Sequence, residues 1–117
     1  MSRFDFQTAM HGRVAFVTLR GELDMHAVAE LEPELERLEC EGTVDVVALD
    51  LRDLDFLDSS GLRAILLFRG LLLEFDRRLV LVRGPIAVQR VFEITRMVDR
   101  LAFVDAPDDP GLNGAAA

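Results

Sequence analysis

The spacing of apolar residues changes along the chain, and this change predicts an alternation of strands and helices. Phe4 and Phe6 alternate with polar neighbours, which is typical of a short, half-exposed edge strand. Continuous apolar runs rich in β-branched residues predict three further strands, the first two of them buried on both faces: 13–19, 44–51 and 78–82. A last short strand is expected around 101–104.

Between these runs, apolar residues recur at three- and four-residue spacing and predict helices. One such pattern runs from Val28 to Leu38, with glutamates on its other side. Pro33 falls inside it and should kink the helix or mark its start, because an interior proline costs roughly 3 kcal/mol. Gly84-Pro85 opens the last helix, since proline suits a first helical turn; its inward face is expected to be Val88, Val91, Phe92 and Thr95.

A middle helix, expected from Ser59 to Phe75, carries more apolar residues than one helix face can bury. Five of them are placed toward the sheet: Leu62, Ile65, Leu66, Leu72 and Leu73. The others form a second stripe on its flank: Leu67, Phe68, Leu71 and Phe75. This stripe is interpreted either as more deeply buried or as a partner or dimer surface.

The resulting order is strand, strand, helix, strand, helix, strand, helix, strand. It predicts a single α/β domain over residues 1–105, with three helices and a mixed, mostly parallel sheet of about five strands. Residues 106–117 contain proline and glycine without apolar periodicity, and we expect them to form a disordered tail.

The charge of the chain narrows the classes of partner. Thirteen basic and 21 acidic residues give a net charge of −8, which disfavours direct binding to nucleic acid or to an anionic membrane and favours a protein partner. All basic residues are arginine, so lysine-dependent chemistry such as Schiff-base formation is excluded. Cys40 is the only cysteine, and no apolar run is long enough to span a membrane, so we expect a cytoplasmic protein.

The stretch DLDFLDSSG, residues 53–61, is the candidate functional segment. In open α/β sheets, sites lie beyond the carboxyl ends of the strands, where the strand-to-helix loops meet. We expect three such loops at one end of the sheet: 21–24, 52–59 and 83–85. The middle loop is longer than such connections usually are, which indicates a contact surface.

Local chemistry leaves several interpretations of this stretch open. Asp58 and the serines have the composition of a helix N-cap. Asp53, Asp55 and Asp58 suggest a metal site, although the calcium-loop glycine and glutamate are missing. The pair Asp53 and Asp55 is similar to the paired aspartates of aspartate-nucleophile phosphatases. A serine-histidine-aspartate site would need His11 or His26, but the G-x-S-x-G elbow is absent.

Three longer segments resemble the STAS domain, and within it the bacterial anti-sigma factor antagonists. They are LRGELDMHAVAELEPEL, VVALDLRDLDFLDSSGLRAILLF and RRLVLVRGPIAVQRVFEIT. The middle segment is the most specific of the three, because the strand, the aspartates and DSSGL follow in this order with GELD upstream.

The resemblance implies a regulatory binding protein rather than an enzyme, with no cofactor, metal or catalytic residue. An anti-sigma factor serine kinase would phosphorylate Ser60, the unphosphorylated form would bind that kinase and release the sigma factor, and a serine phosphatase would reverse the modification. The implied partner-binding residues are Asp24, Asp55, Phe56, Asp58, Ser59, Ser60 and Gly61. A monomer or weak homodimer is expected.

Three features of the chain differ from the common pattern of the family. Arg96 stands where antagonists often have a glycine that ends the helix, so we expect that junction to be reshaped. Many members close with a further helix, for which the Pro-Gly-Ala tail is too short, so the flank under it should be exposed or used for association. Pro33 lies in a region that the kinase often contacts.

Two other functions remain as alternatives. One is a STAS module that binds constitutively as part of a transporter or sensor assembly, although the intact Ser60 argues against it. The other is a small phosphohydrolase that uses Asp53 and Asp55.

Overall fold

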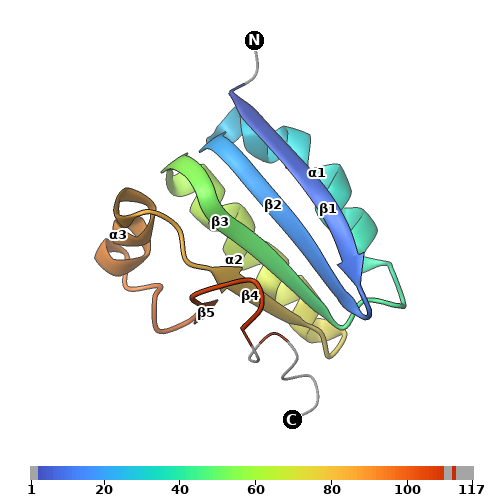
Figure 1. The fold of residues 1–117 in the computed structure, drawn as a ribbon. Helices are drawn as coiled ribbons and strands as arrows, with labels where there is room; N and C mark the ends of the chain where they lie inside the picture. The colour runs from blue at the N-terminus through green and yellow to red at the C-terminus, as the bar shows by residue number, and fades with distance from the viewer. Residues whose placement is uncertain (1–2, 110–111, 113–117) are drawn as a thin grey trace.

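Five strands form one mixed sheet in the order β1-β2-β3-β4-β5 (Figure 1). The computed structural model describes residues 3–109 and residue 112. The strands are β1 (Phe4–His11), β2 (Val14–Leu23), β3 (Val46–Leu57), β4 (Arg78–Val82) and β5 (Ala102–Val104). β1 is antiparallel to β2, and every other neighbouring pair is parallel. The predicted mostly parallel α/β sheet is therefore confirmed.

Three helices follow strands β2, β3 and β4 along the chain. They are α1 (Met25–Glu39), α2 (Ser59–Glu74) and α3 (Ile86–Ile94). In Figure 1, α1 and α2 run behind the sheet, and α3 lies beside β3. Their apolar faces and one face of the sheet share a single core; its most buried large side chains include Leu19, Leu31, Leu38, Leu49, Leu51, Ile65, Phe68, Leu72, Leu81 and Phe92. Burial of this core supplies most of the driving force for folding.

The opposite face of the sheet carries a smaller cluster. Its strand residues are Val14, Val46, Ala48 and Val80, with Phe16 and Val104 partly buried beside them. Residues 13–19 are therefore not covered equally on both faces, since Phe16 and Thr18 remain half exposed. Leu112 also packs into this cluster and is only 2% exposed. The expected disorder of 106–117 stays a prediction for residues 110–111 and 113–117, which lie outside the described residues.

Strand β3 is longer than the sequence pattern predicts, and the expected long loop at 52–59 is wrong. β3 continues to Leu57, which lies opposite Leu23 of β2. The register between the strands shifts twice, and at each shift β3 carries an extra residue relative to β2. Such bulges change which residues point inward, so the buried leucines Leu51, Leu54 and Leu57 follow at three-residue spacing. Because of this spacing, the segment lacks the two-residue alternation of apolar and polar residues that predicts a strand.

Helix α2 buries fewer apolar residues than the interpretation of its second stripe as deeply buried required. Phe68 is 2% exposed and does lie in the core. Leu67 is 59% exposed, Leu71 41% and Phe75 60%, so deeper burial is wrong for these three. Leu73, which was expected to face the sheet, is 48% exposed. The sheet-facing arc of the helix is filled instead by Gly61, Leu62, Ile65, Phe68 and Leu72.

Pro33 lies inside helix α1 and does not mark its start. The helix begins at Met25, directly after its N-cap Asp24, and continues past Pro33 to Glu39. Pro33 is exposed, while Leu31 and Leu35 on either side of it are buried. Contact of these leucines with the core compensates for the backbone hydrogen bond that proline cannot donate.

The junction after α3 keeps the left-handed geometry that a glycine usually provides, so the expected reshaping at Arg96 is wrong. Arg96 has φ 60°. The Met97 amide donates to the carbonyl of Phe92 at 2.8 Å, and the Arg96 amide donates to that of Glu93 at 3.0 Å. These contacts close the helix end as a Schellman motif does. In the last helix, Val88 and Phe92 face inward as expected, but Thr95 is exposed.

Candidate partner-binding site

Two aspartates begin helices α1 and α2 in the same way. The Ala27 amide donates to Asp24 Oδ1 at 2.9 Å, and the Gly61 amide donates to Asp58 Oδ1 at 3.0 Å. Both caps have extended backbones, with φ near −107° and −108°. Each carboxylate satisfies an otherwise unpaired amide of the first helical turn and lies at the positive end of the helix dipole. The N-cap interpretation of Asp58 is thus confirmed.

The two helix starts also contact each other through Leu23, the residue before Asp24. The Asp58 amide donates to the Leu23 carbonyl oxygen in a long hydrogen bond of 3.5 Å. A Cβ atom on Gly61 would lie 2.6 Å from that same oxygen and 2.6 Å from Leu57 Cδ1. Only glycine lets the first turn of α2 approach the end of β2 this closely. The role of the Leu23 carbonyl could not be inferred from a side-chain motif.

Ser59 and Ser60 occupy the first two positions of α2, directly after the cap. Ser59 is exposed and Ser60 is half buried. Within the described part of the chain, neither hydroxyl takes part in a side-chain hydrogen bond. The amides of a first helical turn form a natural site for an anion, and here they lie beside two capping carboxylates.

The second bulge of β3 determines which way Asp55 and Phe56 point. Gly21 lies opposite Leu54 and Glu22 opposite Phe56, which leaves Asp55 as the extra residue. Asp55 and Phe56 are consequently both exposed, and Leu57 returns to the core. Phe56 is 46% exposed and Met25, at the start of α1, is 65% exposed. The end of the sheet therefore presents apolar side chains among acids.

All three expected loops follow the carboxyl ends of neighbouring parallel strands. The β2–α1 turn and Asp58 are joined as described, whereas residues 83–85 follow the shorter strand β4. Val82 at the end of β4 lies opposite Asp50, well before the end of β3. Gly84 instead packs against Leu51, whose carbonyl would be 2.7 Å from an added Cβ. The three loops therefore lie at the same end of the sheet, as expected, but at different heights, because β2 and β3 extend beyond β4.

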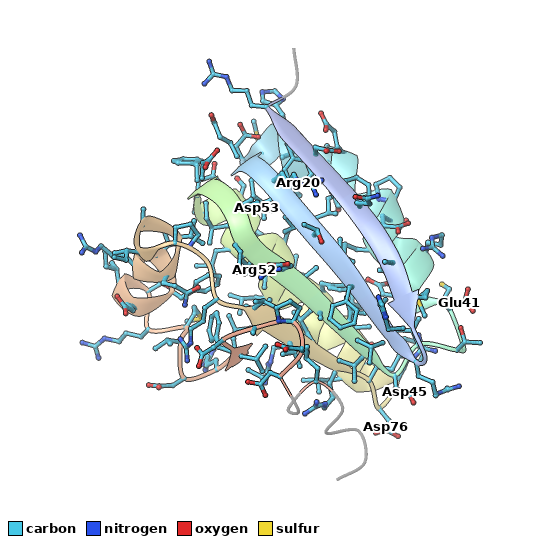
Figure 2. The ribbon with its side chains drawn as sticks, in the orientation of Figure 1. Arg20, Glu41, Asp45, Arg52, Asp53 and Asp76 are labelled. Carbon is cyan, nitrogen blue, oxygen red and sulfur yellow. The ribbon has the colours of Figure 1, made fainter. Side chains whose placement is uncertain are left out.

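Arginines offset part of the acidic charge on the neighbouring strands. Figure 2 shows Arg20 on β2 beside Asp53 on β3, and their charged atoms are 3.8 Å apart. Arg20 also lies 3.6 Å from Asp5, and Arg3 pairs with Glu22 at 3.2 Å. No local sequence motif predicted these pairs, because most of them join residues from different strands. They place positive charge beside Asp53 and Glu22 but leave Asp24, Asp55 and Asp58 without an ion pair among the described residues.

Asp50 precedes the bulged part of β3 and lies on the face of the sheet away from the helices. Asp50 is 5% exposed and accepts hydrogen bonds from Arg52, from Nε at 3.0 Å and from Nη2 at 2.9 Å. The hydrogen bond to this carboxylate raises the pKa of Arg52. The pair is satisfied within the sheet and lies away from the serines, so it is not part of the candidate site.

The described residues do not assemble the alternative sites. Across 3–109 and 112, no group of three or more His, Cys, Asp and Glu side chains is placed to hold a metal ion. His11 packs edge-on against Phe16, with ring centroids 5.2 Å apart, and lies at the end of β1. No hydrogen bond of the described part joins His11 or His26 to either serine. Asp53 of the aspartate pair faces Arg20, and their charged atoms are 3.8 Å apart.

Comparison with known proteins gives four matches relevant to this geometry. The family model described as the STAS domain matches residues 5–109. An anti-sigma-B factor antagonist of Staphylococcus epidermidis is 32% identical over 95 residues, which cover 81% of this chain and 87% of that protein. The unphosphorylated anti-sigma factor antagonist SpoIIAA superposes with a TM-score of 0.81 at 26% identity, with 96% of each chain covered. The Bacillus cell fate determinant SpoIIAA in its phosphorylated form has the same fold, with a TM-score of 0.74 at 24% identity over 95% of this chain and 99% of that one.

Within the same described ranges, none of the helices is both long and apolar enough to cross a membrane.

Proposed function

The chain belongs to the STAS domain family, and from that premise we propose that it is an anti-sigma factor antagonist, a cytoplasmic protein that acts by binding rather than by catalysis. The relatives that carry this name support the role. The proposed partner is an anti-sigma factor that is also a serine kinase. Binding of the unphosphorylated chain would free a sigma factor, without contact between this chain and nucleic acid.

The observation that carries this proposal is the position of Ser60 in the first turn of α2. Ser60 is half buried and follows the Asp58 cap by two residues. A phosphate there adds about −1.5 to −2 charges near backbone amides that favour an anion. The helix start therefore accommodates the modification without refolding, and the domain keeps its shape in both states.

The same phosphate is unfavourable in an interface. Asp58 caps α2, Asp55 precedes this cap by three residues, and Asp24 follows Leu23, whose carbonyl accepts from the Asp58 amide. None of the three carboxylates has an ion-pair partner among the described residues. Burying a phosphate against these carboxylates and a partner costs desolvation and like-charge repulsion. A penalty of roughly 1.4 kcal/mol already lowers affinity tenfold. We propose that phosphorylation of Ser60 switches binding off by this means, and that a serine phosphatase restores the binding form.

The proposed binding surface is the end of the sheet where α1 and α2 begin. It combines the caps Asp24 and Asp58 with Ser59, Ser60 and Gly61, and the bulge adds exposed Asp55 and Phe56. Exposed Phe56 provides an apolar anchor among polar residues, a combination typical of protein interfaces.

Replacement of Ser60 tests the switch directly. Ser60→Ala should bind the partner kinase as the unmodified chain does and resist phosphorylation, whereas Ser60→Asp should bind at least about tenfold more weakly. Affinity is measured by calorimetry with the purified kinase, and phosphate is located by mass spectrometry after incubation with that kinase and ATP. Ser59→Ala is the matched control and should still be phosphorylated. Phosphate on Ser59 or on no residue would refute the assignment, and unchanged binding of Ser60→Asp would favour a constitutive STAS module.

A further inference from the structure

Helix α2 carries a strip of residues that faces directly away from the core. The strip consists of Arg63, Leu67, Gly70 and Glu74, at spacings of four, three and four residues, which place them on one side of a helix. All four are exposed, and Leu67 is 59% exposed. Leu71 borders the strip and is 41% exposed. The strip is thus apolar at its centre and charged at its ends, with opposite signs.

Gly70 at the centre of this strip is not explained by the fold of the chain itself. Glycine in a helix interior is unfavourable compared with alanine. A Cβ atom on Gly70 would meet nothing within 4 Å, whereas one on Gly61 would collide with the end of β2. The missing side chain at Gly70 therefore leaves a notch that only a neighbour from outside the chain can use, as small residues do where two helices pack closely.

The strip is complementary to its own reverse: a positive residue meets a negative one, and a large residue meets a small one. When two copies of α2 pack antiparallel about a two-fold axis between Phe68 and Arg69, residues whose numbers are symmetric about that point come level. Arg63 then lies level with Glu74 of the second copy, and Leu67 lies level with the Gly70 notch. Leu71 then comes level with Leu66 of the second copy, one residue from Leu67 of that copy. A two-fold interface requires this kind of self-complementarity, because the same patch serves both copies.

We propose that this strip of α2 is a homodimer interface, occupied by a second copy of the same chain. Opposite charges at the two ends specify the antiparallel arrangement, since a parallel pair would place like charges together. The net charge of −8 on each copy opposes association at long range, so the dimer forms at high protein concentration and at physiological salt. The interface leaves Ser60 at the end of the helix outside the strip.

Sedimentation equilibrium of the full chain tests the interface at about 0.15 M salt, where the Debye length is about 8 Å. The wild type should show a concentration-dependent monomer–dimer equilibrium. Leu67→Arg should lower the association constant at least about tenfold, because it places a charge against the notch. Ile94→Arg is the matched control: Ile94 is 74% exposed on α3, and its replacement should leave association unchanged. Circular dichroism verifies that both variants are folded.

A charge exchange tests the antiparallel arrangement. Arg63→Glu and Glu74→Arg alone should each weaken the dimer by roughly tenfold, because each repels a like charge in both symmetric contacts. Combined in one chain, they restore opposite pairs and should recover most of the association. Gly70→Ala should raise the melting temperature of the dilute monomer and yet weaken the dimer, a pair of opposite effects that a merely structural glycine would not give.

Three outcomes would overturn the proposal. A wild-type chain that stays monomeric at millimolar concentration excludes the dimer and leaves the strip to a different partner. A dimer that persists in Leu67→Arg lies on another face. A double charge exchange that fails to recover association, although both single exchanges weaken it, excludes the antiparallel pairing.

Discussion

At Gly61, the backbone is helical and yet no side chain fits. An added Cβ would be 2.6 Å from the Leu23 carbonyl oxygen and 2.9 Å from Leu23 Cγ. Backbone atoms cannot yield as flexible side chains do, so the clash is relieved only if α2 moves away from β2. The residue after Ser60 therefore fixes how closely the two helix starts approach each other.

Gly61→Ala should destabilise the chain by about 1–3 kcal/mol, the usual cost of overpacking a tight site. Thermal unfolding at low protein concentration measures the loss. Gly70→Ala is the matched control in the same helix, where the new methyl group meets nothing within 4 Å and alanine is the better helix former. It should raise stability by up to about 1 kcal/mol. Equal effects of the two substitutions would contradict the close approach at Gly61.

Single residues of the site were predictable to the extent that their function is local. Asp58 as an N-cap follows from its place before an apolar helix, and its hydrogen bond to the Gly61 amide confirms it. The tie between Asp58 and the Leu23 carbonyl was not predictable, because it joins backbone atoms far apart in sequence. The role of Ser60 rests on family resemblance and stays a prediction.

Among the elements, the helix ends show how a position can keep its geometry after losing its usual residue. Asp76 after α2 and Arg96 after α3 have φ 58° and 60°, in the left-handed region that glycine prefers. At both ends an amide beyond the helix donates to a carbonyl oxygen of its last turn. Arg77 donates to Leu72 at 2.9 Å, and Met97 donates to Phe92 at 2.8 Å. Burial of Phe92 holds the second junction in place despite the strained arginine.

Arg96→Gly should stabilise the chain by about 0.5–1 kcal/mol, because it relieves the left-handed strain but adds backbone entropy to the unfolded state. Chemical denaturation measures the change. Arg96→Ala removes the same side chain and keeps the strain, so it should gain little. If alanine stabilised as much as glycine, the effect would come from the arginine side chain and not from the backbone.

Strand β3 marks the limit of pattern-based prediction at the scale of an element. Residues 44–51 were recognised as a strand from their continuous apolar character, but the strand continues to Leu57. Two bulges there replace two-residue alternation by three-residue spacing, and acidic residues resemble those of a loop. Only the pairing with β2 identifies this segment as a strand, and such pairing cannot be predicted from the local sequence alone.

For the whole molecule, a carboxylate of α1 connects the helix layer to the edge of the sheet. Glu34 accepts a hydrogen bond from the Thr8 hydroxyl of β1 and two from Arg37, at 2.7 and 2.9 Å. The hydrogen bonds from Arg37 lower the pKa of Glu34, burial opposes this shift, and the Thr8 hydrogen bond adds to it. A pKa lower in the folded than in the unfolded chain means that ionised Glu34 favours the folded state.

Glu34→Gln should therefore lower the melting temperature at pH 7, where ionised Glu34 makes its full contribution. The difference from the wild type should shrink as the pH falls below the unfolded glutamate pKa of about 4.3 and Glu34 takes up its proton. Thermal unfolding between pH 3 and pH 7 measures this convergence. Glu36→Gln, an exposed position on the same helix, is the control. A difference that persists unchanged at pH 3 would contradict the ionic contribution.

The overall architecture was the most predictable property of the molecule. Alternation of strand and helix, read from apolar spacing, indicated the mixed sheet and three helices that the structure shows. The relative lengths of the strands were not predictable, so the shorter reach of β4, which the 83–85 loop follows, could not be foreseen. The exposure of Leu67 and Leu71 was also undetermined, because apolar periodicity does not distinguish a second buried face from an interface.

The shared contact at Leu23 makes the two helix starts energetically dependent on each other. Since Asp58 and Gly61 both depend on that carbonyl, substitutions in the GELD turn and in the DSSG turn should be non-additive in a double-mutant cycle. The affinity of a partner that binds one turn should therefore also depend on the residues of the other turn. Evolution of this surface is then constrained in pairs: a change at one turn alters which residues the other can accept.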